Sequence, residues 1–273
     1  MASFISRGER FEEVGSTNDV VRAWLADGTP EVCMAMADRQ TAGRGRDGRT
    51  WVAPAGAALL LSLGFRPVWM SPPEMWQLAA ITSLAMAEAA ETEAGLAGGT
   101  INLKWPNDLV IAGADGRLRK VGGVLGETEG LGTKDPRVVV GIGVNVDWAA
   151  ADFPPELAPA MTSLREVSGR AVDRGALFER FVDRLEGRLK SLRAGRFDRI
   201  GWTVRQATTG RPIRLETATG IEDAIATGVD VVSGALIVSG PGGAGPERRV
   251  LAGEVLHVRL AGADDTAARR LSA

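Results

Sequence analysis

The sequence has very few of the residues that form disulfides and metal sites. Its 273 residues include one cysteine, Cys33, and one histidine. A single cysteine excludes an intramolecular disulfide, and no Cys/His set has the spacing that structural zinc requires. These shortages fit a reducing compartment, so we expect a cytoplasmic protein.

Long apolar runs, an excess of one charge and tyrosine are also missing. No stretch approaches the ~18 uninterrupted apolar residues that span a bilayer, and the N-terminus lacks the apolar segment of a signal peptide. The 32 Lys and Arg residues and 34 Asp and Glu residues give a net charge of −2, and the pI is about 5.7. Aromatic residues make up 5% of the chain. We therefore expect no membrane or broad nucleic-acid binding.

The apolar content, 45% of the chain, is ample for one large domain or two ordinary ones. Apolar residues recur at helical spacing in three segments, which predicts three helices. The second is apolar enough to be buried. The expected caps and ends are Ser16 or Thr17 with Gly28 for the first helix, a capping box of Ser71 and Glu74 for the second, and Asp173 for the third.

Short β-type runs separated by turn residues make up much of the remaining chain. Residues 57–66 form an almost wholly apolar strand that we expect to be covered on both faces. Beyond residue 210, short runs rich in Thr, Val, Gly and Ile predict a small all-β barrel of about 50 residues. The boundary is expected near residue 205, which gives domains 1–205 and 206–273. Four runs with short links favour antiparallel hairpins, at 101–105, 109–112, 120–127 and 137–146.

The stretch 38–51, D-R-Q-T-A-G-R-G-R-D-G-R-T-W, combines arginine and glycine with almost nothing apolar before Trp51. Glycine permits positive φ and close backbone approach, and arginine offers a planar fork matched to carboxylate and phosphate. We interpret the stretch as an anion-binding loop, against the alternative of a solvated basic turn or an RNA-binding patch. The residues concerned are Gly43, Gly45, Gly48, Arg44, Arg46 and Arg49.

Polar residues interrupt apolar elements elsewhere, and each group has an ordinary structural interpretation. Ser16, Thr17 and Asn18 can simply cap a helix, although donors at a helix start also hold small anions. Gln40 alone is an ordinary surface amide. The segment K-W-P-N-D-L, residues 104–109, is either a tight hairpin or a site that gathers a cation, an amide and a carboxylate.

Glycines inside strands give a further signal. Lys120 can be a charge that protects a strand edge, but Gly122 and Gly123 behind it weaken a strand. Such glycines indicate that a ligand or another backbone approaches closely. The run G-I-G-V-N-V has a similar pattern, and a buried Asn145 would need hydrogen-bond partners.

These motifs occur in one order: S-T-N, Q-x-x-G-R-G-R-x-G-R-x-W, K-W-P-N-D, K-x-x-G-x-L-x-E and G-I-G-x-N-V, then a small β domain ending in G-E-V. The ordered set resembles the biotin protein ligases, from Glu13 to about Arg259. The resemblance implies an α+β fold: a mixed β-sheet with flanking helices, as in class II synthetases and biotin/lipoate ligases, plus a C-terminal SH3-like β-barrel. It also implies ATP-dependent activation of biotin to biotinyl-5′-AMP with release of pyrophosphate. Biotin would then pass to a lysine of a biotin carboxyl carrier domain of acyl-CoA carboxylases.

The resemblance also assigns roles to residues that match the motifs. Lys120 would hold the biotin carboxylate, and the arginine loop would cover biotin and the nucleotide phosphates. The residues implied in biotin binding are Ser16, Thr17, Asn18, Gln40, Arg44, Gly45, Arg46, Lys120, Gly122 and Gly123. Those implied in nucleotide binding are Arg46, Arg49, Trp51, Lys104, Asn107 and Asn145. The catalytic set is Arg44, Lys120 and Asp108, with Mg²⁺ as cofactor and Asp108 as its expected ligand.

Two features depart from the family pattern. Asp47 stands where the family loop often carries a basic residue, and it can pair with Arg46 or Arg49 and weaken the field at the phosphates. Only some fifteen residues precede S-T-N, whereas some relatives carry an N-terminal winged helix-turn-helix. We therefore expect no direct DNA binding.

Two alternatives stay open. Lipoate ligases and octanoyl transferases share the implied catalytic fold, but they lack the G-R-G-R-x-G-R-x-W loop. A non-enzymatic RNA-binding or protein-binding module would use the loop for RNA and the barrel for protein contacts. The acidic pI and the shortage of aromatic residues count against the RNA-binding alternative.

Overall fold

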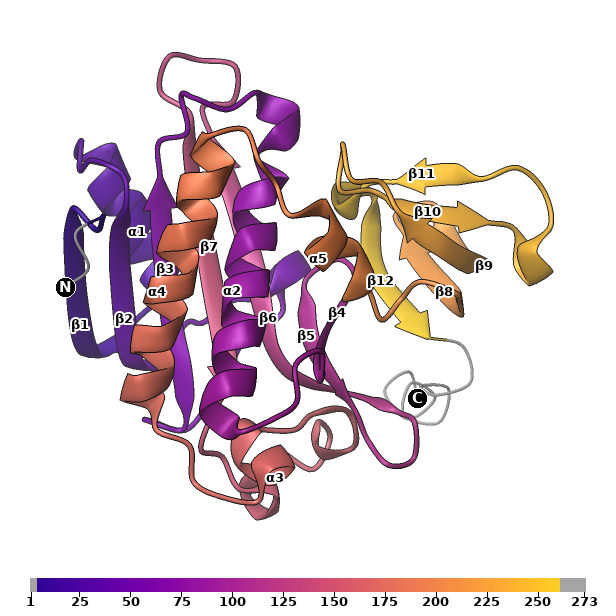
Figure 1. The fold of residues 1–273 in the computed structure, drawn as a ribbon, viewed down its shortest axis with the longest axis horizontal. Helices are drawn as coiled ribbons and strands as arrows, with labels where there is room; N and C mark the ends of the chain where they lie inside the picture. The colour runs from indigo at the N-terminus through magenta and orange to yellow at the C-terminus, as the bar shows by residue number, and fades with distance from the viewer. Residues whose placement is uncertain (1–3, 261–273) are drawn as a thin grey trace.

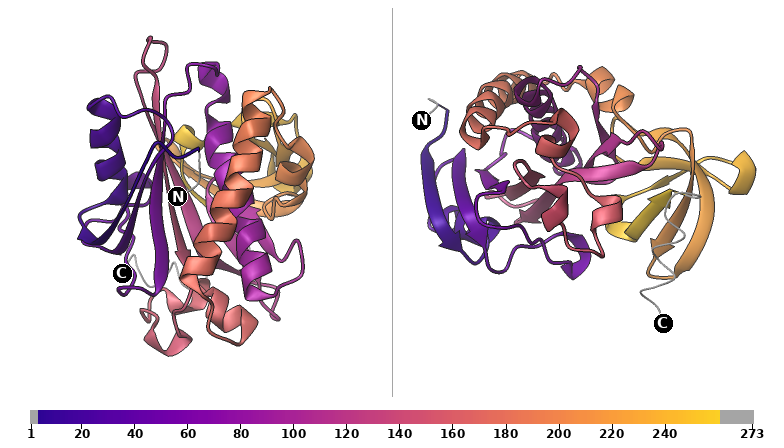
Figure 2. Two further views of the ribbon diagram at one scale, coloured as in Figure 1. Left: turned by 60° about the vertical axis from the view of Figure 1, so that its left-hand side comes forward. Right: turned by 90° about the horizontal axis from the view of Figure 1, so that it is seen from below.

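The structure is a computed structural model that describes residues 4–260. Its main layer is a seven-stranded mixed sheet in the order β1-β2-β3-β7-β6-β5-β4. Helices α2 (Trp76–Ala94) and α4 (Arg174–Arg193) cover one face, and α1 (Thr17–Ala26) packs on the other (Figures 1 and 2). The strands are β1 (Arg7–Val14), β2 (Cys33–Gln40), β3 (Ala58–Phe65), β4 (Ile101–Lys104), β5 (Asp108–Ala112), β6 (Leu118–Glu129) and β7 (Arg137–Asn145).

Helix α2 is buried on most sides, as expected, because the sheet lies against one side of it and α4 against another. Its start differs from the expectation. Pro72–Glu74 form a short 3-10 turn, η2, in which the backbone N–H of Glu74 bonds to the Ser71 carbonyl. The Ser71 hydroxyl donates to the Glu74 carboxylate at 2.5 Å and caps no backbone group. The expected capping box is therefore wrong, and the α-helix begins at Trp76.

The other two long helices begin where the sequence predicts. The Asp173 carboxylate accepts the backbone N–H groups of Gly175 and Ala176, at 2.7 and 3.1 Å, and so caps α4. Ser16 precedes α1 with an extended backbone, but its side chain makes no capping hydrogen bond. Ser16 therefore stands at the expected N-cap position without a capping side-chain hydrogen bond, and its role in binding stays a prediction.

Two strands, β1 and β2, were not predicted from the sequence. β1 reads R-G-E-R-F-E-E-V and is a largely exposed edge strand, and β2 is rich in alanine and methionine, which have no strong β preference. β1 pairs parallel with β2, and β2 pairs antiparallel with β3. Both segments are strands because they hydrogen-bond to neighbouring strands, and not because their side chains alternate between apolar and polar. The expected antiparallel hairpins from β4 to β7 are confirmed.

A second, antiparallel sheet follows two short helices, α3 (Leu164–Ser168) and α5 (Arg199–Val204). Its order is β11-β10-β9-β8-β12. The run expected as one strand near the end of the chain is split by a 3-10 turn, η6 (Ala252–Glu254), into strands on opposite edges of this sheet. The strands are β8 (Arg211–Thr217), β9 (Gly220–Val229), β10 (Leu236–Ser239), β11 (Arg248–Val250) and β12 (Val255–Leu260). Closure of this sheet into an SH3-like barrel stays a prediction.

The second sheet joins the first beside β4 (Figure 1). The Leu103 N–H donates to the Arg205 carbonyl at 2.7 Å, and the Ala207 N–H donates to the Leu103 carbonyl at 2.9 Å. The Trp105 indole N–H donates to the Gly234 carbonyl at 2.9 Å. The turn between β4 and β5 is thereby tied to the second sheet.

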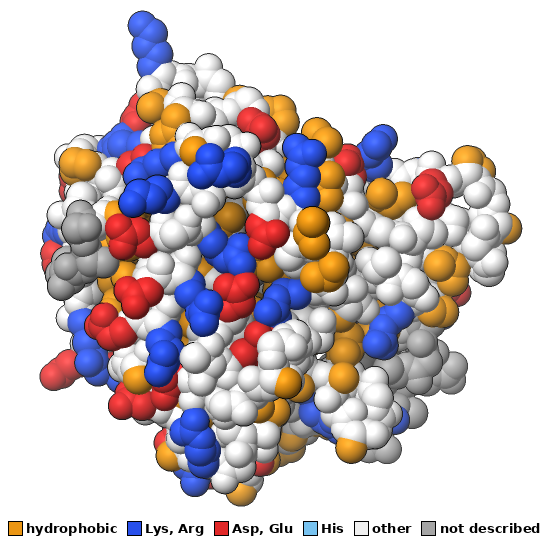
Figure 3. Space-filling view, in the orientation of Figure 1, with side chains coloured by type: hydrophobic (Ala, Val, Ile, Leu, Met, Phe, Trp, Pro, Cys, Tyr) orange, Lys and Arg blue, Asp and Glu red, His pale blue; other side chains and the backbone are white. Residues whose placement is uncertain are grey.

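The face formed by α2 and α4 carries interspersed basic and acidic side chains (Figure 3). Ion pairs join many of them, such as Arg188 with Glu88 at 2.5 Å and Arg180 with Glu93 at 2.7 Å. No helix within residues 4–260 is long and apolar enough to cross a membrane.

Candidate active site

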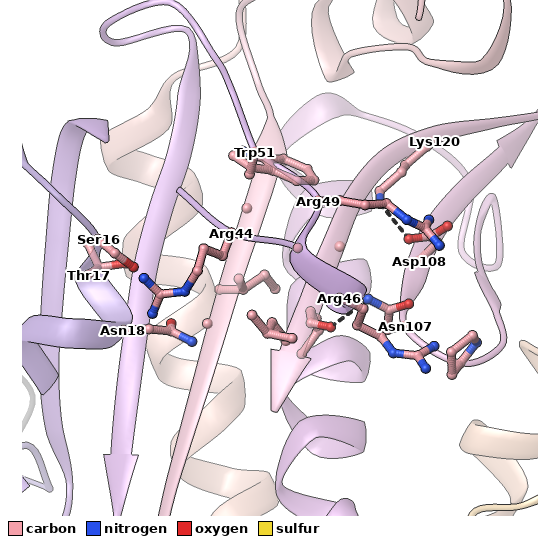
Figure 4. Close-up of a pocket in the computed structure, with 18 of the residues that line it drawn as sticks. Ser16, Thr17, Asn18, Arg44, Arg46, Arg49, Trp51, Asn107, Asp108 and Lys120 are labelled. Atoms are coloured by element: carbon pink, nitrogen blue, oxygen red, sulfur yellow. Dashed lines mark hydrogen bonds and ion pairs between the residues drawn. The ribbon is translucent and has the colours of Figure 1, made fainter. Parts of the chain in front are cut away.

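A cavity lies on the face of the large sheet that carries α1 (Figure 4). The start of α1, the loop 43–51 and the turn between β4 and β5 surround it, and β3, β6 and β7 contribute to its floor. All predicted site residues except Gly122 and Asn145 line it. Motifs that are far apart in the sequence therefore meet around one cavity.

Two glycines of β7 make room for side chains that lie over the sheet. A Cβ atom at Gly141 would overlap Asn18 Oδ1, and one at Gly143 would lie 2.6 Å from the Trp51 ring. Residues two apart in a strand point to the same face. The close approach that the strand glycines predicted is therefore made by Asn18 and Trp51.

Neutral polar groups gather at the cavity beside the start of α1. The Thr17 backbone N–H and hydroxyl both donate to Gln40 Oε1, at 2.7 and 3.0 Å. The hydroxyl of Ser62, fully buried in β3, lies 2.7 Å from Thr17 Oγ1 and 2.5 Å from Asn18 Oδ1. We call Ser16, Thr17, Asn18, Gln40 and Ser62 the amide end. Fixed neutral donors and acceptors of this kind suit a ligand group of amide type.

Arg44 lies beside the amide end and is held from outside the cavity by Asp19. Arg44 Nη1 and Nη2 lie 2.7 and 2.6 Å from the two Asp19 oxygens. The hydrogen bond from Arg44 lowers the pKa of the Asp19 carboxyl, with a further contribution from Arg22. The pair is therefore ionised at neutral pH. A guanidinium has five N–H donors, so this pairing leaves others for a ligand.

Arg46 also lines the cavity, but its guanidinium bonds to the second sheet. Nη2 donates to the carbonyl oxygens of Ala252 and Val255, at 2.5 and 2.7 Å. Burial lowers the pKa of this guanidinium. The contact with biotin that the resemblance implies would require the Arg46 side chain to turn.

Asp47 occupies the left-handed backbone region, with φ of 56° and ψ of 37°. Aspartate is one of the few residues besides glycine that adopt this conformation readily. Its carboxylate lies 3.7 Å from Arg49 Nη2, and the Arg49 side chain is 52% exposed. The sequence predicted that Asp47 pairs with Arg46 or Arg49, and the ion pair supports Arg49.

Charged groups gather on the other side of the cavity. Lys120 Nζ lies 2.5 Å from Asp108 Oδ1 and 5.3 Å from the centre of the Trp51 ring. Arg49 and Lys104 line the same region. We call Arg49, Lys104, Asp108 and Lys120 the cationic end. Three positive charges against one negative charge make it suitable for an anionic ligand.

A β-bulge sets the direction of Lys120. The register of β6 against β5 shifts between Lys120 and Gly122, so Val121 is an extra residue. Because a bulge re-aims the side chains beside it, Lys120 and Gly123 share a face. A Cβ atom at Gly123 would lie 3.2 Å from Lys120 Nζ. Gly123 therefore provides the space that Lys120 occupies.

The remaining predicted residues are engaged within the protein. Asn107 lines the cavity, and its Nδ2 donates to the Val124 carbonyl at 3.0 Å. The buried Asn145 donates to the Thr162 carbonyl at 2.9 Å, so it has the kind of partner that its burial requires. A Cβ atom at Gly122 would lie 2.8 Å from the Gly143 carbonyl oxygen, so its glycine serves strand packing.

Three residues that hold the site together were not predicted: Asp19, Ser62 and Glu127. Ser62 is the polar side chain in the run A-L-L-L-S-L-G-F, and a buried hydroxyl needs partners. That signal was available in the sequence. Glu127 accepts from Asn18 Nδ2 at 2.5 Å across a separation of 109 residues. Glu127 is the last residue of the K-x-x-G-x-L-x-E motif, but only the fold shows its contact with Asn18. Asp19 does not differ in sequence from an ordinary surface charge.

The chain is similar to known proteins over most of its length. A model of the biotin/lipoate A/B protein ligase family matches residues 11–145. The biotin–[acetyl-CoA-carboxylase] ligase of Mycobacterium tuberculosis is 32% identical over 252 residues, which cover 90% of this chain and 87% of that protein. The bifunctional ligase/repressor BirA of Bacillus spizizenii is 32% identical over 80% of this chain, which spans only 65% of that protein. The biotin protein ligase from Aquifex aeolicus, solved with biotin and ATP, has a TM-score of 0.75 at 26% identity, covering 94% of this chain and 100% of that one.

Proposed function

Because this chain belongs to the biotin/lipoate A/B protein ligase family, we propose that it is a biotin protein ligase. It activates biotin with ATP to biotinyl-5′-AMP, releases pyrophosphate and transfers biotin to a lysine of a biotin carboxyl carrier domain. The observation that carries the proposal is the meeting of a neutral amide end and a cationic end in one cavity. Biotin itself has a cyclic urea at one end and a carboxylate at the other. The two ends of the cavity match these two groups.

The amide end binds the urea. Ser16, Thr17, Asn18 and Gln40 supply hydroxyl and carboxamide groups, and the burial of the first three makes unpaired positions costly. A ligand that lacks the urea leaves those groups without partners. Lipoate has no urea, so this end favours biotin over lipoate.

The cationic end and Arg44 bring two anions together. The biotin carboxylate attacks the α-phosphorus of ATP, and fixed positive charges cancel the repulsion between them. Lys120 has three N–H donors, one of which serves Asp108, so others can hold the biotin carboxylate. Arg49, Lys104 and a turned Arg46 face the phosphates, and the Trp51 ring packs over the adenylate.

Mg²⁺ would be held by Asp108 together with the triphosphate. No group of three or more His, Cys, Asp or Glu side chains that could hold a metal occurs within residues 4–260. Mg²⁺ is commonly bound by one or two carboxylates together with substrate phosphates, and Asp108 in the cavity lining fits that role. When bound, the ion neutralises triphosphate charge and assists departure of pyrophosphate.

Asp108 also assists the second half-reaction. The lysine of the carrier has an ordinary pKa of ~10.4 and must lose a proton before it attacks the mixed anhydride. Asp108 is the carboxylate in the cavity lining, and AMP is the leaving group. Transfer from preformed biotinyl-adenylate should be slower in Asp108→Asn, and transfer at the wild-type rate would exclude this role.

The carrier, the domain organisation and the location follow from the same proposal. The acceptor is a biotin carboxyl carrier domain of an acyl-CoA carboxylase, and the protein acts in the cytoplasm. We assign residues 1–205 to the catalytic domain and 206–273 to an SH3-like domain. The start of β8 at Arg211, shortly after α5, supports that boundary.

The test is exchange of labelled pyrophosphate into ATP. Exchange should depend on biotin and should not be supported by lipoate or octanoate. Exchange that required lipoate instead would replace this function with that of a lipoate ligase. The absence of exchange with any of these acids would overturn ligase activity altogether.

A further inference from the structure

Asn18 is held at both ends of its carboxamide. Its Nδ2 donates to Glu127 Oε2 at 2.5 Å, and its Oδ1 lies 2.5 Å from the Ser62 hydroxyl. The oxygen and the NH₂ group of a carboxamide are nearly equal in size, so packing alone does not decide which way it faces. A carboxylate can only accept hydrogen bonds. Glu127 therefore fixes the NH₂ group of Asn18 on its own side.

This orientation matters for the ligand because Asn18 lines the cavity and is 5% exposed. A carboxamide held one way offers one pattern of donors and acceptors, and a flipped carboxamide offers the reverse. A cyclic urea also has a fixed pattern, with one carbonyl oxygen and two N–H groups. A mismatch would place donor against donor in a buried site, where an unmade hydrogen bond is costly.

Arg22 balances the charge of Glu127. Arg22 Nη2 lies 2.8 Å from Glu127 Oε1, and its Nε lies 3.0 Å from Glu129 Oε1. The two Glu127 oxygens therefore have different partners: one binds the cation, and the other faces Asn18. Both requirements are met only by a side chain with two acceptor oxygens.

We propose that Glu127 is a positioning residue for biotin, which acts through Asn18 to fix the donor and acceptor pattern of the amide end. This inference rests on the biotin ligase function proposed above. The Glu127 and Arg22 side chains are 28% and 31% exposed. Ion pairs near the surface contribute little to stability. A purely structural role for Glu127 would therefore give small and unselective effects.

The decisive substitution is Glu127→Gln. Glutamine has one oxygen, and Arg22 attracts it, so its NH₂ group is left facing the NH₂ group of Asn18. The KM for biotin in the exchange assay should rise about tenfold, the effect of losing one hydrogen bond to a charged group. The KM for ATP should stay unchanged.

Glu129→Gln is the matched control. It removes the same charge from the same Arg22, but the Asn18 carboxamide bonds to Glu127 and not to Glu129. Its KM for biotin should stay within about twofold of the wild type, as for other ion pairs near the surface. Equal shifts in the two variants, or equal changes in the KM for biotin and for ATP, would overturn the positioning role.

A double-mutant cycle tests whether Glu127 acts through Asn18. In an Asn18→Ala background, Glu127→Gln should cause no further rise in the KM for biotin, because the group that it orients is gone. Additive effects of the two substitutions would contradict the inference. The exchange assay on the wild-type protein distinguishes failure of this inference from failure of the proposed function. If the wild type showed no biotin-dependent exchange, the proposed function itself would be refuted.

Discussion

The two ends of the cavity hold their functional groups in different ways. At the amide end, Thr17, Asn18 and Ser62 are buried and bonded to one another or to Gln40 and Glu127. At the cationic end, Lys120 and Arg49 are 36% and 52% exposed. Lys120 pairs with Asp108, and Arg49 with Asp47.

The difference follows from the cost of burial. A buried neutral group needs a hydrogen-bond partner at all times, so the amide end is ordered by its own network before a ligand arrives. A charged group cannot be buried alone, so the cations stay partly in water, beside partners that a phosphate or carboxylate can share or displace. In the proposed function, the amide end would therefore select the ligand, and the cationic end would stabilise the reacting anions.

The largest expected effect comes from removing the charge at the cationic end. Lys120→Ala should lower the rate of biotin-dependent exchange by at least about a hundredfold, the usual effect of losing one preorganised group that stabilises developing charge. The KM for biotin should also rise, because Lys120 is proposed to hold its carboxylate. Exchange kinetics over a range of biotin concentrations would measure both.

Lys190→Ala is the control for this substitution. Lys190 is exposed in the last turn of α4, on the far side of the sheet from the cavity. The Lys190→Ala substitution removes one positive charge, as Lys120→Ala does, and should leave the rate of biotin-dependent exchange unchanged. If Lys120→Ala behaved like Lys190→Ala, the proposed division between a selecting end and a reacting end would be wrong.

Two glycines of β7 allow each end to be disturbed separately. Gly141→Ala places a methyl group against Asn18 and should raise the KM for biotin about tenfold to thirtyfold, because small displacements of a buried binding group are costly. Gly143→Ala places a methyl group against the Trp51 ring and should affect the KM for ATP by a similar factor. Steady-state kinetics with each substrate varied in turn would separate them.

Gly126→Ala provides the reference for a glycine substitution in the same sheet. A Cβ atom there would meet Ala79 Cβ at 3.8 Å, an ordinary contact, so neither KM should move. Circular dichroism would show that all three variants fold. If Gly141→Ala and Gly143→Ala raised both KM values equally, the two ends would not be independent.

The same contrast explains what the sequence could predict. Motif residues such as Asn18 and Lys120 could be predicted because they match motifs of the biotin protein ligases. The glycines in the strands indicated that another group lies close to the backbone there. Ser62 could have been found, because a hydroxyl in an apolar strand requires partners. Glu127 belongs to the K-x-x-G-x-L-x-E motif, but its contact with Asn18, 109 residues away in the sequence, could not be predicted. Asn145 is predicted to bind the nucleotide, which stays a prediction; the structure adds that its Nδ2 donates to the Thr162 carbonyl, a partner that the sequence did not indicate.

Pairing between charges was also beyond the sequence. Asp108 and Lys120 were expected to act separately, on metal and on biotin, yet they form one ion pair across neighbouring strands. The pairing depends on the bulge at Val121, and a bulge has no reliable signature in a single sequence. Charged side chains have many possible partners, and register decides among them.

The smallest expected effect concerns Asp47, the acid in the arginine loop. Its 3.7 Å ion pair with a half-exposed Arg49 contributes little, so Asp47→Asn should change the KM for ATP by less than about twofold. Asparagine also adopts the left-handed backbone that Asp47 has, whereas Asp47→Ala would strain the loop by about 1 to 2 kcal/mol. The alanine variant should therefore raise the KM for ATP more than the asparagine variant, although both lose the same charge. A clear fall in the KM for ATP in Asp47→Asn would contradict this expectation, because it would show that the carboxylate weakens the positive field at the cationic end. The main effect of having Asp47 in the loop would then be electrostatic rather than conformational.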